Sequence, residues 1–155
     1  MRAEDVASWY FRLNGFLSLP RFVVHLDQDK AEVGADGIPR YQRTEADLIA
    51  VRFLESREII NSFGGKREMH DDQKLLDLYC SGENKQALFI VVEVTSGLCK
   101  MNGPWTNSNK KNMQRVIRRL GFATSESNIE KIAEDMYRSG RYEDDFYAMQ
   151  YICLG

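Results

Sequence analysis

The sequence has few of the features that mark membrane, secreted or disulfide-rich proteins. Its apolar runs all fall short of the roughly 20 residues that a membrane-spanning helix requires. Residues 1–5 do not follow the basic-then-apolar order of a signal peptide. The three cysteines, Cys80, Cys99 and Cys153, are odd in number and lack CxxC spacing, which indicates free thiols in a reducing compartment. We therefore expect a soluble, cytoplasmic protein with no membrane partner.

Histidine is equally scarce. His25 and His70 are the two histidines of the chain, and they lie far apart in the sequence without a third partner. A zinc site built from histidine and cysteine is therefore not expected. Any bound metal should be a hard cation held by oxygen atoms.

Composition and charge are those of an ordinary globular domain. The chain has 155 residues, of which 43% are apolar and 28% charged, so we expect residues 1–155 to form a single domain. The formal net charge of −2 does not indicate a protein that binds polyanions through its overall charge. Basic residues nevertheless gather between Lys100 and Arg119, so the sequence is compatible with a local basic face.

Apolar periodicity in the first two thirds of the chain predicts one helix and three strands. Apolar side chains recur at helical spacing over residues 4–14. Short apolar or β-branched runs predict strands at 22–26, 44–53 and 87–96, and a polar loop follows the first of them. The run at 87–96 is apolar on both faces, as a central buried strand should be.

The segment between the second and third strands is ambiguous. Residues 62–66 have the composition of a turn, and residues 71–79 have the apolar spacing of a short helix. We interpret residues 54–86 as an insertion at the edge of the domain.

Two further helices and a strand are predicted in the last third. An Asn or Ser within 107–109 can cap a helix that ends at Gly121. Ser127 and Glu130 form a capping-box pattern for a second helix that ends at Gly140. The apolar run 146–154 then predicts a final buried strand. This order of elements predicts an α/β fold with a mixed central β-sheet flanked by helices.

Two acidic residues stand inside apolar runs, and they are the most informative feature of the sequence. Asp47 lies within residues 44–51, and Glu93 lies within residues 89–95. Burying a charge is costly unless it is paired or bound to a metal. Each acid can also lie solvated at a strand end, or form a salt bridge with Arg43 or Arg52.

Alternation along the strands places more oxygen atoms beside these two acids. Glu45 shares a face with Asp47, and Thr95 shares a face with Glu93. If the two faces agree, two carboxylates supplemented by the carbonyl of Val94 and by water suit Mg²⁺. Such a cation activates water and stabilises charge on a phosphoryl oxygen in phosphodiester hydrolysis.

The same pattern resembles a known family. Asp47 followed by an apolar strand, Glu93-Val94-Thr95 on the next strand and Gln114 in the helix behind resemble the PD-(D/E)xK nuclease superfamily, which has the restriction-endonuclease-like fold. The resemblance covers roughly residues 4–121, and several of its segments are similar to uncharacterised bacterial proteins assigned to that superfamily.

The resemblance implies roles for individual residues. Asp47 and Glu93 would be ligands of Mg²⁺ or Mn²⁺, together with the carbonyl of Val94. Thr95 stands where the family has a lysine that orients or deprotonates the attacking water, and its neutral hydroxyl cannot supply that cation's charge. Lys100 is a candidate to supply that charge in place of Thr95, if its side chain reaches back toward the site. The candidate catalytic residues are thus Asp47, Glu93, Thr95, Lys100, Gln114 and Glu45.

A basic stripe on the helix after Pro104 is the candidate nucleic-acid contact. Lys111, Arg115 and Arg118 fall opposite the apolar stripe of that helix. They form either a solvated helix face or a footprint for phosphate groups, whose binding would be salt-sensitive and independent of sequence. Gln114, between the two stripes, can either point to the site or bond a neighbouring loop.

The sequence therefore predicts a metal-dependent nuclease domain that hydrolyses phosphodiester bonds in nucleic acid, with DNA as the expected substrate. The alternative is a catalytically degenerate nuclease-fold module that binds nucleic acid or protein, and Thr95 is its main support. The resemblance also implies a homodimer or a partner protein, because many domains of this family act as dimers or beside an ATPase.

Overall fold

A computed structural model describes residues 2–33, 35–37, 39–54, 56, 58–61, 67–70, 87–100 and 102–155. Its elements in chain order are α1 (Ala3–Leu13), β1 (Leu17–Val33), β2 (Pro39–Phe53), β3 (Glu58–Asn61), β4 (Arg67–His70), β5 (Ala87–Val94), α3 (Gly103–Thr106), the 3₁₀ turn η1 (Ser108–Lys110), α4 (Asn112–Leu120), α5 (Glu126–Ser139), β6 (Arg141–Glu143) and β7 (Tyr147–Leu154). Within these ranges, no helix has both the length and the apolar character that crossing a membrane requires.

Five of the strands form one mixed sheet in the order β1-β2-β5-β7-β6. The strands β1, β2 and β5 are antiparallel neighbours, whereas β7 pairs with β5 in parallel. The parallel pair is joined by a long connection that carries α3, α4 and α5, as a crossover must be. The expected mixed sheet between helices is confirmed.

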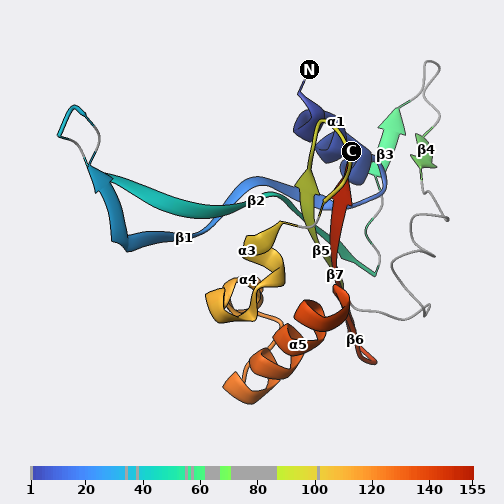
Figure 1. The fold of residues 1–155 in the computed structure, drawn as a ribbon. Helices are drawn as coiled ribbons and strands as arrows, with labels where there is room; N and C mark the ends of the chain where they lie inside the picture. Colours follow the sequence, from blue (N-terminus) through green and yellow to red (C-terminus); the bar gives the residue numbers. More distant parts are fainter. Residues whose placement is uncertain are drawn as a thin grey trace.

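Helices cover both faces of this sheet (Figure 1). On one face, Phe11 of α1 packs edge-on against Phe16 with ring centroids 5.3 Å apart, over apolar residues of β2, β5 and β7. On the other face, α3, α4 and α5 bury side chains such as Trp105 and Met113 against the same strands. Strand β5 is buried on both faces over nearly its whole length, as expected for a central strand.

The expected polar loop after residue 26 is wrong. The strands β1 and β2 continue as one antiparallel hairpin whose register runs from Leu17↔Val51 to Val33↔Pro39, with two irregularities. Backbone pairing needs no apolar side chains, so the ladder extends past the apolar run that marked the strand. Figure 1 shows this hairpin projecting from the layered body as a long arm.

Two predicted helix starts are also wrong, although the predicted ends are confirmed. The side chain of Asn107 accepts a hydrogen bond from Asn109 N–H at 3.0 Å, but it caps the short turn η1 and not α4. Helix α4 begins only at Asn112, after Lys111 in a left-handed conformation. Both α4 and α5 end at glycines with positive φ, which is the local signal that predicted them.

The start of α5 differs by two residues from the capping-box prediction. Ser125, and not Ser127, is the N-cap, and its Oγ accepts a hydrogen bond from Asn128 N–H at 3.2 Å. Both serines precede helical residues, so the sequence pattern alone does not choose between them.

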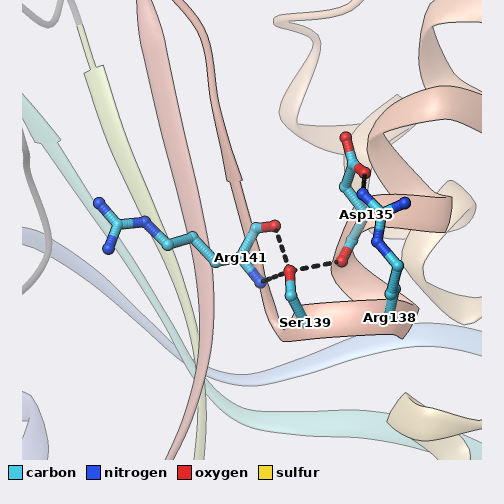
Figure 2. Close-up of polar contacts among 4 residues, drawn as sticks. All are labelled: Asp135, Arg138, Ser139 and Arg141. Carbon is cyan, nitrogen blue, oxygen red and sulfur yellow. Dashed lines mark hydrogen bonds and ion pairs between the residues drawn. The ribbon is translucent and has the colours of Figure 1, made fainter.

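The end of α5 is tied to β6 by a small polar network (Figure 2). Ser139 Oγ lies 2.9 Å from the carbonyl oxygens of both Asp135 and Arg141, and it accepts a hydrogen bond from Arg141 N–H. Arg138 pairs with Asp135 one turn earlier. Gly140 then accepts a hydrogen bond from Tyr151 N–H at 2.8 Å, which links this junction to β7.

The interpretation of residues 54–86 as an insertion stays a prediction. Strands β3 and β4 form their own two-stranded antiparallel sheet, separate from the main sheet. The expected turn at 62–66 and the expected helix at 71–79 lie outside the described residues.

Candidate functional site

The candidate site lies where β2 and β5 stop pairing. Their ladder ends at Leu48↔Val92, and Asp47 and Glu93 are the next residues along each strand. Beyond that point the N–H of Val94 donates to Oδ2 of Asp47 at 2.8 Å. The carboxylate thus takes the place of a backbone carbonyl at the end of the ladder, while β2 continues with β1 alone.

The carboxyl groups of Asp47 and Glu93 lie in contact. The charge of Asp47 acts directly on the Glu93 carboxyl group, so the two groups are adjacent. Their neighbours two residues away, Ile49 and Val91, belong to the core on the α3–α5 face. Alternation along β5 places Glu93 on that face, where it meets Trp105, and Asp47 lies next to it. Asp47 and Glu93 therefore lie on the same face of the sheet, which is the condition that the sequence analysis set for a shared site.

Glu93 is held in an apolar setting by an aromatic donor. Its residue is 8% exposed, and the indole N–H of the buried Trp105 donates to its Oε1. The pKa of Glu93 is raised to about 7, first by burial and then by the charge of Asp47. Hydrogen bonds from Trp105 and Asn102 act in the opposite direction. Two like charges at close range favour the binding of a proton. Near neutral pH the Asp47–Glu93 pair therefore tends to hold one proton between its two carboxyl groups.

Two contacts hold the segment 102–105 against β7, and a third ties it to α4. The N–H of Asn102 donates to the Tyr151 hydroxyl at 3.1 Å, and the ring of Trp105 lies 6.3 Å from that of Tyr151. The side-chain amide of the buried Asn112 donates to the carbonyl of Pro104 at 2.8 Å. The pKa of Tyr151 is raised to about 12, first by burial and then by nearby negative charges that include Glu93. Its hydroxyl is therefore a neutral structural partner.

Sequence reasoning missed Trp105, Asn102 and Tyr151 as site residues. The available signal was Trp105 itself, because a tryptophan that becomes buried usually needs an acceptor for its N–H. The sequence offers no indication that this acceptor is a carboxylate on the central strand. Tyr151 was predicted only as part of a buried strand.

Glu45, Thr95 and Lys100 lie near the pair along the chain. Glu45 is half-buried opposite Val23 of β1. The hydroxyl of Thr95 donates to the carbonyl of Gly97 at 3.3 Å, and the side chain of Lys100 is exposed. In the part of the chain that the structure describes, neither Thr95 nor Lys100 hydrogen-bonds to the two acids.

The position of Gln114 is set by α5. The Tyr137 hydroxyl donates to Gln114 Oε1 at 3.0 Å and accepts from the N–H of Met113 at 3.1 Å. The pKa of Tyr137 is raised, mainly by burial, so it keeps its proton for this bond. The structure thus links Gln114 to the neighbouring helix.

The three basic residues of α4 and its approach are spread over different contacts. Lys111 is exposed just before the helix. Arg115 donates to the carbonyl of Lys110 at 2.8 Å and to the side chain of Asn112. Arg118 forms an exposed ion pair with Glu126 of α5.

The donor set at the pair fits an oxygen-bound cation with few protein ligands. Among the described residues, no group of three or more His, Cys, Asp or Glu side chains is placed to hold a metal ion. Asp47 and Glu93 are a pair, and each uses one carboxylate oxygen in the hydrogen bonds with Val94 and Trp105. Each keeps a second oxygen, and Mg²⁺ commonly takes one or two carboxylates and several waters.

Comparison of the chain with protein-family models, curated proteins and solved structures finds no match. The function of the pair therefore has to be inferred from its own chemistry.

Proposed function

We propose that this chain is a nuclease domain of the restriction-endonuclease-like fold that hydrolyses phosphodiester bonds in DNA with Mg²⁺ or Mn²⁺. The observation that carries the proposal is the contact between Asp47 and Glu93 at the end of the β2–β5 ladder. Two adjacent carboxylates repel each other unless a proton or a cation lies between them. A divalent cation held there supplies positive charge to a phosphoryl oxygen and lowers the pKa of a bound water.

The surrounding residues support a preformed site. Val94 N–H fixes Oδ2 of Asp47, and Trp105 N–H fixes Oε1 of Glu93, so the remaining oxygens have defined directions. Burial of Glu93 excludes water from one side of the pair and strengthens its electrostatic interactions. In the main sheet, β1, β2 and β5 follow α1 in the chain, and β6 and β7 follow the crossover helices, which is the kind of order that the resemblance implies.

In this proposal, the basic residues near α4 supply the phosphate contact. The ion pair of Arg118 with Glu126 is exposed, and such pairs contribute little to stability, so a phosphate group can compete for the guanidinium. Lys111 is exposed beside it along the chain. Contacts of this kind give binding that weakens with salt and reads no base sequence.

The test is cleavage of double-stranded and single-stranded DNA in Mg²⁺ or Mn²⁺ by wild type and Asp47→Asn. Asparagine keeps an oxygen for Val94 N–H but loses the negative charge, so we expect at least about a hundredfold loss of cleavage. The matched control is Asp135→Asn on α5, which removes an equal charge from the pair with Arg138 and should cleave like wild type. Equal cleavage by wild type and Asp47→Asn would overturn the proposal.

A second candidate is a degenerate nuclease-fold module that binds nucleic acid or protein without cutting it. The observation that favours it is Thr95, whose hydroxyl bonds to Gly97 where the family resemblance expects a cationic lysine. The discriminating variant is Thr95→Lys. A wild type that binds DNA without cleaving it, together with cleavage by Thr95→Lys, would select this second candidate.

A further inference from the structure

The turn between β5 and α3 lies against Cys153, near the end of β7. The thiols of Cys99 and Cys153 are close enough for each to act on the ionisation of the other, and the backbone N–H of Lys100 and the hydroxyl of Thr95 lie near the Cys153 sulfur. Cys99 is exposed and Cys153 is half-buried, and both are free thiols. Two cysteines that are far apart in the sequence are therefore adjacent in the fold.

Backbone pairing fixes this arrangement. In the parallel ladder Cys153 lies opposite Glu93, and the N–H of Thr95 donates to the carbonyl of Leu154 at 2.8 Å. A Cβ built on Gly155 would lie 3.1 Å from the sulfur of Cys99, so that sulfur rests directly against the end of β7. The sheet thus fixes the position of Cys153, and the Cys99 sulfur lies against the residue that follows β7.

We propose that Cys99 and Cys153 are a modification site that forms an intramolecular disulfide when the protein meets a small-molecule disulfide oxidant. The inference stands on these two thiols and does not depend on nuclease activity. Disulfides in reducing compartments are usually transient and redox-sensing, which suits a dithiol with one exposed member.

The chemistry proceeds by two thiol–disulfide exchanges. The thiolate of the exposed Cys99 attacks one sulfur of the oxidant, and the other half of the oxidant leaves as a thiolate. The thiolate of Cys153 then attacks the Cys99 sulfur of this mixed disulfide and expels the second half. The protein loses two protons and two electrons, and the oxidant gains them as two thiols. Burial and the neighbouring Cys99 raise the pKa of the Cys153 thiol, in keeping with its role as the second thiol to react.

The bond would join the turn at 95–100 to β7 next to the segment that carries Trp105. It would close a long loop of the chain, since its partners lie on either side of α3, α4 and α5. Closing a long loop restricts the unfolded chain and raises the melting temperature when the native geometry accepts the bond.

Peptide mapping tests the proposal directly. Reduced full-length protein is treated with oxidised glutathione, blocked with iodoacetamide and digested with trypsin. Tryptic cleavage places the three cysteines on separate peptides, 75–85, 86–100 and 142–155, so each pairing has its own mass. We expect wild type and the matched control Cys80→Ser to yield the linked 86–100 and 142–155 peptides, and Cys99→Ser to yield none.

Thermal unfolding supplies the second measurement. Oxidised wild type should melt on the order of 10 °C above its reduced form, and the difference should disappear in Cys99→Ser. Free Cys99 and Cys153 after oxidation, or links from either of them only to Cys80, to glutathione or to another molecule, would overturn the proposal. A linked protein that melts below the reduced form would overturn it too, because the native fold would then have to distort to form the bond.

Discussion

The indole N–H of Trp105 donates a hydrogen bond to Oε1 of Glu93, and both residues are buried. Each satisfies a requirement of the other. A buried indole needs an acceptor, and a buried carboxyl needs a donor. The contact joins the crossover segment to the central strand at the point where the two acids meet. It therefore couples the stability of the domain to the ionisation of the candidate site.

The first prediction concerns pH. Glu93 has a folded-state pKa of about 7, raised from its usual 4.5, so folding favours the protonated form. Its contribution to stability is complete below pH 4.5 and is lost as the pH rises to about 7. The loss corresponds to roughly 3 kcal/mol. Glu93→Gln should remove this step in the free energy of unfolding measured by urea titration between pH 4.5 and 8. A step of equal size in the variant would assign it to another group.

The second prediction concerns the donor. Trp105→Phe keeps an aromatic ring in the core but removes the N–H that lowers the pKa of Glu93. The variant should lose ~1–3 kcal/mol at pH 8, because the carboxylate would lose a donor while it is charged. At pH 4.5 the loss should be smaller. Urea unfolding at both pH values measures the difference, and an equal loss at the two would contradict a bond to an ionising group.

The third prediction separates the charge of Asp47, which raises the pKa of Glu93, from the hydrogen bond that Asp47 accepts from Val94 N–H. Asp47→Asn should lower the pKa of Glu93, because the Asp47 charge raises it. The pH-dependent loss of stability should then end below pH 7. Asp47→Ala should show the same shift and cost a further ~1–2 kcal/mol, since Val94 N–H loses its acceptor. Identical unfolding curves for the two variants would show that this hydrogen bond contributes nothing.

The fourth prediction tests the assignment of Gln114 to a structural contact. Tyr137→Phe removes a hydroxyl that bonds to both Gln114 and Met113, and should destabilise the protein by ~1–2 kcal/mol. Gln114→Leu should destabilise it by a similar amount, and a double variant should lose less than the sum. Strict additivity would show that the two side chains act independently.

The parts of the fold that sequence predicted correctly depend on local signals. The glycine ends of α4 and α5 were predictable because a left-handed residue closes a helix wherever it occurs. The burial of β5 followed from a run that is apolar on both faces. The hairpin arm was missed because its polar composition does not reveal backbone pairing with a distant strand.

The candidate site divides in the same way. That Asp47 and Glu93 share a face follows from the period of two along their strands, provided that the strands pair in this register. The donor Trp105 and the pairing of Cys99 with Cys153 depend on how the crossover segment folds back onto the sheet. No local pattern specifies that return, so these contacts became visible only in three dimensions.

Calorimetric titration of Mn²⁺ or Mg²⁺ into the purified protein at pH 8 tests the central claim most directly. We predict one site in wild type, the same site in Asp135→Asn, and none in Asp47→Asn or Glu93→Gln. Near pH 7, binding should also release a proton, because the cation replaces the proton held by Glu93. Absence of binding to wild type, or undiminished binding to Asp47→Asn, would contradict the account.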